Sequence, residues 1–508
     1  MAPANPHSPW LWGAAIFAML WVIARACVQS ITIDEADAYL FFAAPHPASH
    51  WLASSGNHLL NSLIMRLFTS VFGLSPVTVR MPSLIGAAIY ICAMYYLVRL
   101  LSRELKLQLP LFICLVYNPF VMDYLVAGRG YCLATAFLAA AIVIAAWSLS
   151  PENAPHLRPY KVCSLCSLCA ALSFCGTYSF AIVDATALGF IFWWVVRTQR
   201  PVRTAKLLAA CIFPGLLLTA VLAGSILVDW RNISLAWGAK SLRETFSSVI
   251  DASYYQPNPY LLNPPLYAFV SKWHEWLFPL LGIACLWQLI WILLNRSALG
   301  DPWSRWRAAF ALGICGTLAV SLTIHRLMYR FVHILMPLGR RAVFIAPLCM
   351  MAAGVLSAMR APSRIGSWAR RSALAMLCAT AVYFVACLRL TYFMEWEYDA
   401  DAKNLYSVLA WYNHQDCVTE VSANWRYVAA LNFYRVYSGR EDFLEIPAGP
   451  PQVAEYPPGK PIYVVFYPSD RPFIDREKLK VVYHDRVTEA AIAIRPEVES
   501  APCRRPPL

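Results

Sequence analysis

Three carboxylates stand within four residues at one point of the chain. Asp34, Glu35 and Asp37 follow directly after an apolar stretch at residues 9–28. Charged groups at the end of a membrane-length stretch are costly to dehydrate, so we expect them to face water or a polar cavity. Carboxylates in such a place can serve as a general base, a metal site or a proton relay.

The elements that position these acids are apolar. Of the 508 residues, 59% are hydrophobic and 14% charged, whereas a soluble domain carries about a quarter charged residues. Apolar runs near the roughly 20-residue length that crosses a bilayer recur up to residue 390. We therefore predict an α-helical polytopic membrane protein with about eleven spans. The predicted spans are 9–28, 83–101, 107–123, 130–149, 162–179, 180–196, 206–228, 274–294, 307–324, 342–358 and 372–390.

Lys and Arg set the expected orientation, because cytoplasmic loops are enriched in them. Basic loops fall on one side if the N-terminus is cytoplasmic: 99–106, 197–206, 296–307 and 360–371. The acids and the C-terminal segment then lie outside a cytoplasmic (inner) membrane. A competing basic group falls on that outer side, which suggests a specific role for it: Arg326, Arg330, Arg340 and Arg341. The net charge of +13 otherwise reflects topology and anionic lipid, and no nucleic-acid motif is present.

The sixteen cysteines do not indicate a disulfide scaffold, because most lie in apolar spans. Cys163, Cys166 and Cys169 recur at helical spacing, which favours a buried stripe over a metal or redox pair. Cys417 and Cys503 lie in the presumed outer domain, and the sequence leaves a disulfide between them open. The first apolar stretch lacks the features of a cleaved signal peptide, so we expect it to stay as an anchor.

Domain organisation follows from composition. Residues 1–390 form the membrane domain, with external loops at 29–82 and 229–273. The first loop contains an amphipathic segment at the membrane interface, and the aromatics of the second are either anchors or a sugar or lipid platform. Residues 391–508 predict a small α/β domain, with a helix at 425–437 and strands at 418–422, 462–467, 481–483 and 490–494. We interpret its opening acids as a solvated stretch: Glu395, Glu397, Asp399 and Asp401.

Several motifs carry a family resemblance. Asp34-Glu35, residues 56–62 (G-N-H-L-L-N-S) and residues 79–84 (V-R-M-P-S-L) resemble membrane glycosyltransferases of the GT-C superfamily. The chain is most similar to bacterial proteins like protein O-mannosyltransferases and lipid A aminoarabinose transferases. The likeness extends through residues 118–120, 123–124, 127–131 and 338–341. It is strong in the first 140 residues and weak in the C-terminal domain.

The resemblance implies an inverting transferase that moves a sugar from a polyprenyl-phosphate donor to a lipid, glycan or protein acceptor. By motif position, Asp34 matches the family's catalytic aspartate and Glu35 its usual neighbour. The chemistry agrees, because an attacking hydroxyl needs one base and arginine can meet the donor phosphate. The candidate phosphate-binding residues are Arg340, Arg341, Arg129 and Arg330. The candidate substrate-binding residues are Asp37, Asn57, His58 and Tyr131.

Alternatives remain at this stage. Asp37 is an additional acid relative to many family members, so Asp34 and Asp37 become ligands of Mg²⁺ or Mn²⁺ if the reaction needs a metal; we favour transfer without a cofactor. A transporter or flippase of lipid-linked sugars predicts internal repeats and ionisable residues near midspan, and we find no obvious repeat. A non-catalytic membrane subunit that binds through its outer domain is the second rival.

Overall fold

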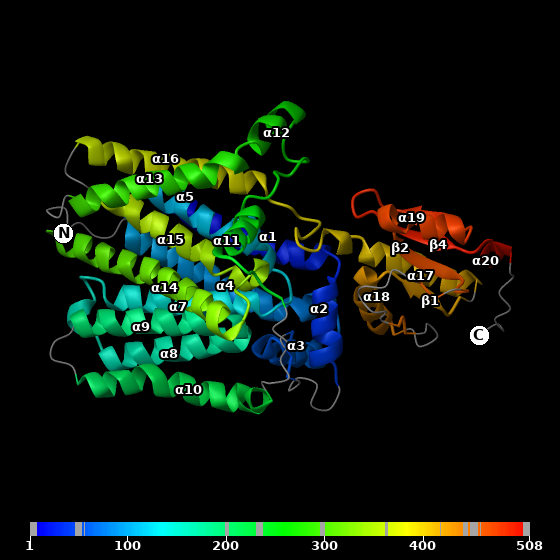
Figure 1. Cartoon of the computed structure of the whole chain (residues 1–508), viewed down its shortest axis with the longest axis horizontal. Helices are drawn as coiled ribbons and strands as arrows, with labels where there is room; N and C mark the ends of the chain where they lie inside the picture. Colours follow the sequence, from blue (N-terminus) through cyan, green and yellow to red (C-terminus); the bar gives the residue numbers. More distant parts are fainter. Residues whose placement is uncertain are drawn as a thin grey trace.

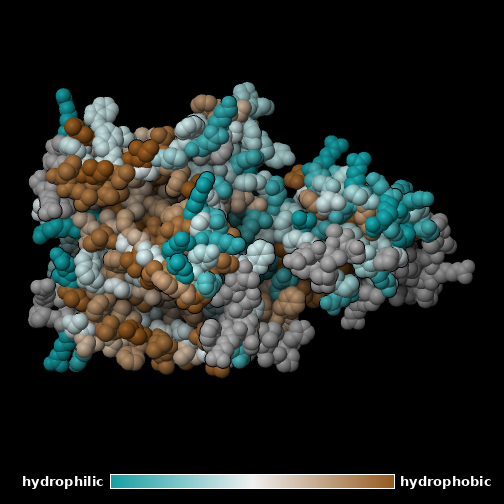
Figure 2. Space-filling model, viewed as in Figure 1, coloured by the Kyte–Doolittle hydropathy of each residue, from teal (hydrophilic) through white to brown (hydrophobic). Residues whose placement is uncertain are grey.

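The computed structural model describes residues 8–45, 53–54, 56–198, 203–229, 237–294, 300–360, 364–416, 418–439, 445–447, 456–457 and 459–500. Within these ranges, ten helices are long and apolar enough to cross a membrane. They are α1 (Pro9–Val28), α4 (Pro76–Leu101), α7 (Tyr131–Ser148), α8 (Pro159–Gly176), α9 with its preceding turn (Tyr178–Thr198), α10 (Thr204–Val228), α13 (His274–Leu294), α14 (Pro302–Val332), α15 with its preceding turn (Gly339–Ala358) and α16 (Arg364–Ala386). The helices run side by side in one bundle (Figure 1), whose surface is largely apolar (Figure 2). The predicted α-helical polytopic class is confirmed.

The third predicted span is broken. The apolar segment forms α5 (Leu105–Val116), and a new short helix, α6, covers Pro119–Tyr124. Asn118 causes the break, because its side chain accepts hydrogen bonds from the amides of Phe120 and Val121 and caps α6. Proline follows at the first helical position, where its missing N–H costs nothing. The described chain thus has ten long apolar helices plus one short one at the predicted position.

One end of the bundle collects basic residues from loops far apart in sequence. Glu104 forms ion pairs with Arg360 and with Arg370, the latter at 2.8 Å. Arg307 donates a hydrogen bond to the Leu101 carbonyl. Three of the four basic loops that were predicted to share a side therefore meet at the same end, which we call the basic end.

The opposite end carries the acids, and we call it the acidic end. Helix α2 (Ile33–Asp37) continues into a π-helix, η1 (Ala38–Ala43), and α3 (Leu59–Phe72) follows. In Figure 1 these segments (dark blue) lie between the bundle and the C-terminal domain. The second loop contributes α11 (Leu242–Ser253) and α12 (Pro264–Ser271).

The C-terminal domain is a four-stranded sheet with helices. Its strands are β1 (Val421–Ala423), β2 (Ile462–Phe466), β3 (Lys480–His484) and β4 (Ala490–Ile494), in the order β1-β2-β4-β3. Strands β1 and β2 are parallel, and the other pairs are antiparallel. The helices are α17 (Ala402–Asp416), α18 (Trp425–Tyr437), α19 (Tyr467–Arg476) and α20 (Pro496–Ser500). The predicted strands and the helix at 425–437 are confirmed, whereas α17 and α19 were not predicted.

The acidic helix shares a hydrophobic core with the C-terminal domain. Ile31, Ala36 and Tyr39 belong to the same buried cluster as residues of α17 and α18. The rings of Tyr39 and Phe433 lie 5.9 Å apart, edge to face. The domain therefore buries one side of the acidic segment, and its packing fixes where α2 sits.

Two cysteine predictions have different outcomes. Of the predicted buried stripe on α8, Cys163 and Cys166 are fully buried and Cys169 is half-buried. Cys417 and Cys503 lie outside the described residues.

Candidate active site at the acidic end

The local sequence makes α2 and sets which acids face the same way. Thr32 caps the helix: its side chain accepts a hydrogen bond from the Glu35 amide, and the Glu35 side chain accepts one from the Thr32 amide. This capping box stabilises a helix of only five residues. Asp34 and Asp37 are three positions apart, so they lie on one helical face, while Glu35 points elsewhere.

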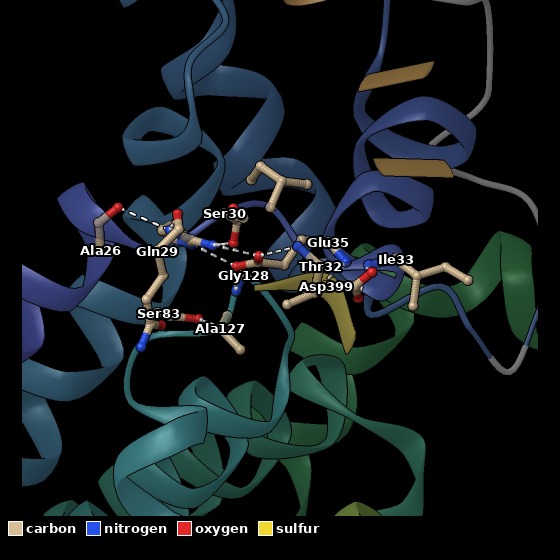
Figure 3. Close-up of polar contacts among 12 residues, drawn as sticks. Ala26, Gln29, Ser30, Thr32, Ile33, Glu35, Ser83, Ala127, Gly128 and Asp399 are labelled. Atoms are coloured by element: carbon tan, nitrogen blue, oxygen red, sulfur yellow. Dashed lines mark hydrogen bonds and ion pairs between the residues drawn. The ribbon is translucent and has the colours of Figure 1, made fainter. Parts of the chain in front are cut away.

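Glu35 is completely buried, and both of its carboxylate oxygens accept hydrogen bonds from the protein (Figure 3). Arg80 donates from Nε to Glu35 Oε1 and from Nη2 to Oε2, each at 2.7 Å. The Gly128 amide donates to Oε1 at 2.7 Å and the Thr32 amide to Oε2 at 3.0 Å. Each oxygen of Glu35, which was predicted to be catalytic together with Asp34, thus already accepts two hydrogen bonds from the protein.

Glycine is required at position 128 by this close approach. A Cβ atom there would lie 3.0 Å from the Val79 carbonyl oxygen and 3.4 Å from Glu35 Oε1. A side chain would crowd Val79 most, so the backbone of this loop would have to shift beside the amide that binds Glu35. The motif at residues 127–131 thus serves the buried Glu35–Arg80 pair as well as the site.

Asp34 is the centre of a network at the surface of α2. Its Oδ2 accepts hydrogen bonds from Arg340 and, at 2.8 Å, from the indole N–H of Trp396. Arg129 donates to the Asp34 carbonyl at 3.1 Å, and its Nη2 lies 4.0 Å from Oδ1. Burial alone would raise the pKa of Asp34, but Arg129 and Arg340 outweigh it, so the pKa is lowered. Asp34 is a firmly ionised and well-held carboxylate.

Glu395 and Trp396 were missed as site residues. Glu395 accepts a hydrogen bond from the Tyr124 hydroxyl, and its Oε1 lies 3.3 Å from Arg340 Nη1. Trp396 packs its ring 5.9 Å from the Arg340 guanidinium in addition to binding Asp34. Both residues belong to the stretch that leads from the bundle into the C-terminal domain.

The interpretation of that stretch as solvated acids is wrong for Asp399 and Asp401, whereas Glu395 is exposed and Glu397 is half-buried. Asp399 is only 1% exposed and accepts a hydrogen bond at 2.7 Å from the Ile33 amide, the first residue of α2. Asp401 is buried and accepts a hydrogen bond from the Tyr483 hydroxyl at 2.8 Å. These acids satisfy donors at the junction between domains, which the one-dimensional charge pattern could not reveal.

Contacts from the bundle also hold the stretch that joins it to the C-terminal domain. Arg25, at the end of α1, forms a buried ion pair with Asp123 at 2.6 Å. The other Asp123 oxygen accepts a hydrogen bond from the Met394 amide at 2.7 Å. Asp123 thus ties α1 to the segment that carries Trp396, which binds Asp34, and Glu395, which contacts Arg340.

Asp37 differs from Asp34 and Glu35 in its side-chain contacts. Within the described part of the chain it makes no hydrogen bond or ion pair, and its side chain is partly exposed. Burial and the nearby charge of Asp34 raise the pKa of Asp37 to about 6, although Arg129 lowers it. Among the described residues, Asp37 is the acid on this face with both carboxylate oxygens available, whereas Asp34 has only Oδ1.

The predicted substrate-binding residues His58 and Tyr131 lie together beneath the site. Their rings are 4.7 Å apart, and Tyr131 also contacts Tyr124 at 5.2 Å. His58 Nδ1 bonds the Gly176 carbonyl at 2.9 Å, and among the described residues its Nε2 has no partner. Burial and Arg129 hold the pKa of His58 well below its usual value, so the ring is neutral. Asn57 is buried and accepts a hydrogen bond from Ser62.

Arg341 and Arg330 are not brought to Asp34 by any contact among the described residues. Arg341 donates to the Trp237 carbonyl, on the side of the second loop. Arg330 is exposed on α14. Of the four predicted phosphate-binding residues, Arg340 and Arg129 therefore converge at the acids.

A divalent cation at the acids would compete with N–H donors that already bind Asp34. Asp34 Oδ2 already faces two N–H donors, from Arg340 and Trp396. No group of three His, Cys, Asp or Glu side chains with metal-binding geometry occurs in the described ranges. Two arginines beside Asp34 would also repel a cation.

Comparison with known proteins gives a distant structural likeness. No protein-family model matches the chain, and no curated protein sequence matches it. ArnT from Cupriavidus metallidurans in the apo state is similar at 9% identity and a TM-score of 0.37, over 95% of this chain and 96% of that chain. ArnT from the same organism bound to undecaprenyl phosphate is similar at the same identity and TM-score, over 96% of this chain and 98% of that chain.

Proposed function

We propose that this protein is an inverting GT-C glycosyltransferase that moves one sugar from a polyprenyl-phosphate donor to an acceptor hydroxyl. One observation carries the proposal: at the junction of an apolar bundle and a polar domain, Asp34 lies against Arg340 and Arg129, with a second carboxylate, Asp37, on the same face. The arrangement provides a base and a phosphate-binding group within one site. A lipid tail can remain beside the bundle while its phosphate reaches the arginines.

The two arginines suit different tasks in this reaction. The Arg340 side chain is 31% exposed and can reach an incoming phosphate, whereas that of Arg129 is 6% exposed and mainly holds the Asp34 backbone. Guanidinium binds phosphate oxygens in a bidentate way. It also stabilises the negative charge that develops on the leaving phosphate. No metal is needed for either effect.

The proposed location is a cytoplasmic membrane with the N-terminus inside and residues 391–508 outside. The basic end then faces the cytoplasm, in keeping with the enrichment of Lys and Arg there. A reporter that is active only after export should be active when fused after residue 400. Activity of a cytoplasm-only reporter at that point would place the acids on the wrong side for this reaction.

The direct test is transfer by the purified protein in proteoliposomes. Polyprenyl-phosphate sugars are supplied with candidate acceptors, and the released polyprenyl phosphate is measured. Cells that lack the protein should accumulate the lipid-linked sugar, which mass spectrometry identifies. Movement of the intact donor between leaflets without release of polyprenyl phosphate would favour the transporter alternative instead.

A further inference from the structure

We infer that Asp37, and not the motif residue Asp34, accepts the proton from the acceptor hydroxyl. The inference rests on the proposed function and deepens it by dividing the work between the two acids. Asp34 becomes a positioning residue that holds Arg340 and Arg129, and Asp37 becomes the catalytic base. Three features of the described residues support this division.

The first feature is the occupancy of Asp34. Arg340 and the Trp396 indole both donate to Oδ2, and Arg129 faces Oδ1. A base must present a lone pair to the proton that it removes. Oδ2 therefore already accepts two hydrogen bonds and is poorly placed to take a proton. Oδ1 accepts no hydrogen bond within the described ranges, but Arg129 lies 4.0 Å from it, and the positive charges around Asp34 lower the pKa of the carboxylate.

The second feature is the position of Asp37. It lies on the same face of α2 as Asp34, one turn closer to η1. Its carboxylate is partly exposed and has no hydrogen bond or ion pair within the described ranges. An acceptor hydroxyl that reaches Asp37 can therefore meet an open carboxylate without displacing a contact of that side chain.

The third feature is the charge around Asp37. The groups that act on it are Asp34 on the same helix, Arg129 from the loop before α7, and Asp399 from the junction. Helix α18 packs on α2, and its buried titratable side chains are Tyr427 and Tyr434. Burial raises the pKa of both phenols, so they stay neutral when Asp37 titrates. The pKa of about 6 places Asp37 close to the working range of a general base.

The step balances without a further reactant. The acceptor oxygen forms a bond to the anomeric carbon as the bond from that carbon to the phosphate oxygen breaks. The hydroxyl proton moves to a carboxylate oxygen of Asp37, and polyprenyl phosphate leaves with the electron pair of the broken bond. Arg340 meets the charge on the phosphate. Water then takes the proton from Asp37, because its side chain is partly exposed.

The test compares pH profiles of transfer for four proteins: wild type, Asp37→Asn, Asp34→Asn and Asp251→Asn. Wild-type turnover should fall as the pH drops below about 6, since the base must be deprotonated. Asp37→Asn should lower turnover by on the order of 10²–10⁴-fold and abolish this fall at low pH, the acid limb of the profile. Asp34→Asn should keep the limb but move it to lower pH, because the negative charge that raises the pKa of Asp37 is gone.

The controls distinguish loss of the base from misfolding and from failure of the proposed function. Asp251→Asn makes the same change on an exposed part of α11 and should behave as wild type. Binding of undecaprenyl phosphate by Asp37→Asn should match wild type, which excludes misfolding, and Asp37→Glu should recover part of the activity. If Asp37→Asn retains wild-type turnover, or if Asp34→Asn alone removes the acid limb, the assignment of the base is overturned. Absence of transfer by wild type with any donor would overturn the proposed function and this inference together.

Discussion

The two ends of the bundle both bring arginine to carboxylate, but they do so in opposite proportions. At the basic end one carboxylate, Glu104, meets three cations, Arg360, Arg370 and Lys106, and Glu152 pairs with Arg103. Burial would raise the pKa of Glu104, but hydrogen bonds and charges from its three cations lower it to about 2. Arg360 and Lys106 are largely exposed there. This is a clamp between loops with no open acceptor.

At the acidic end the carboxylates outnumber their partners. Glu35 takes Arg80 for itself, so Arg340 and Arg129 remain beside four acids: Asp34, Asp37, Glu395 and Asp399. Burial raises the pKa of both Glu395 and Asp399. The cluster therefore cannot hold every acid in its charged form at low cost. The surplus of acid, rather than the presence of ion pairs, is what distinguishes the proposed active site from the cluster at the basic end.

The largest loss of stability should come from breaking the buried Glu35–Arg80 pair at the acidic end. The corresponding change at the basic end should cost much less. Arg80→Ala leaves Glu35 buried and without its main partner, which costs about 3–5 kcal/mol of stability. Glu104→Gln removes a charge from a partly exposed cluster and should cost less than about 1 kcal/mol. Thermal unfolding of both variants in the same detergent measures the contrast. Equal stabilities would mean that Glu35–Arg80 is not the structural centre of the acidic end.

The next prediction concerns donor use at Arg340. Arg340→Lys keeps the charge but loses bidentate geometry, so the apparent KM for the donor should rise by on the order of 10-fold, and more for Arg340→Ala. Arg341→Lys is the matched control, because Arg341 faces the Trp237 carbonyl. Steady-state kinetics with varied donor measures these effects. Unchanged KM in both Arg340 variants would shift the phosphate site to Arg129.

The sequence predicted the secondary-structure elements far better than the arrangement of the site. The helical spans and the sheet follow from hydropathy and periodicity, which are local properties. Asp34, Arg129 and Arg340 were named from motifs, and they do converge. The break at Asn118-Pro119 has an equally local cause, because proline and a capping residue act on their immediate neighbours.

The role of each acid could not be predicted, because it depends on partners far away in the chain. Glu35 pairs with Arg80, 45 residues away, and Asp34 binds Trp396, 362 residues away. Nothing local distinguishes buried Glu35 from its neighbours Asp34 and Asp37. One signal for Glu395 was present: acids follow directly after the last span, as they do after the first. Two acidic stretches that leave the membrane on the same side can meet, as these do.

A smaller effect should follow from removing the hydrogen bond of the indole. Trp396→Phe keeps a ring against Arg340 but takes one N–H from Asp34, so the pKa of Asp34 rises. A hydrogen bond to a charged group contributes about 1.5–3 kcal/mol, and the remaining arginines offset part of its loss. We expect kcat/KM to fall by roughly 3- to 30-fold on this basis. Trp411→Phe, on the exposed face of α17, should leave it unchanged.

The smallest effect should be that of a chelator. Arginines already surround Asp34, and Arg340 and Trp396 bind the oxygen that a cation would need. Magnesium requires near-octahedral oxygen ligation, and these donors would have to leave before it could form. EDTA should therefore leave the rate of transfer within error of the untreated protein, at donor concentrations below and above KM. Asp34→Asn makes the test more sensitive. A metal site built on Asp34 and Asp37 would lose a ligand in this variant, and transfer would respond to added Mg²⁺ or Mn²⁺. Loss of transfer with EDTA and its return with either ion would make both acids ligands, and would remove the distinction between a positioning acid and a base.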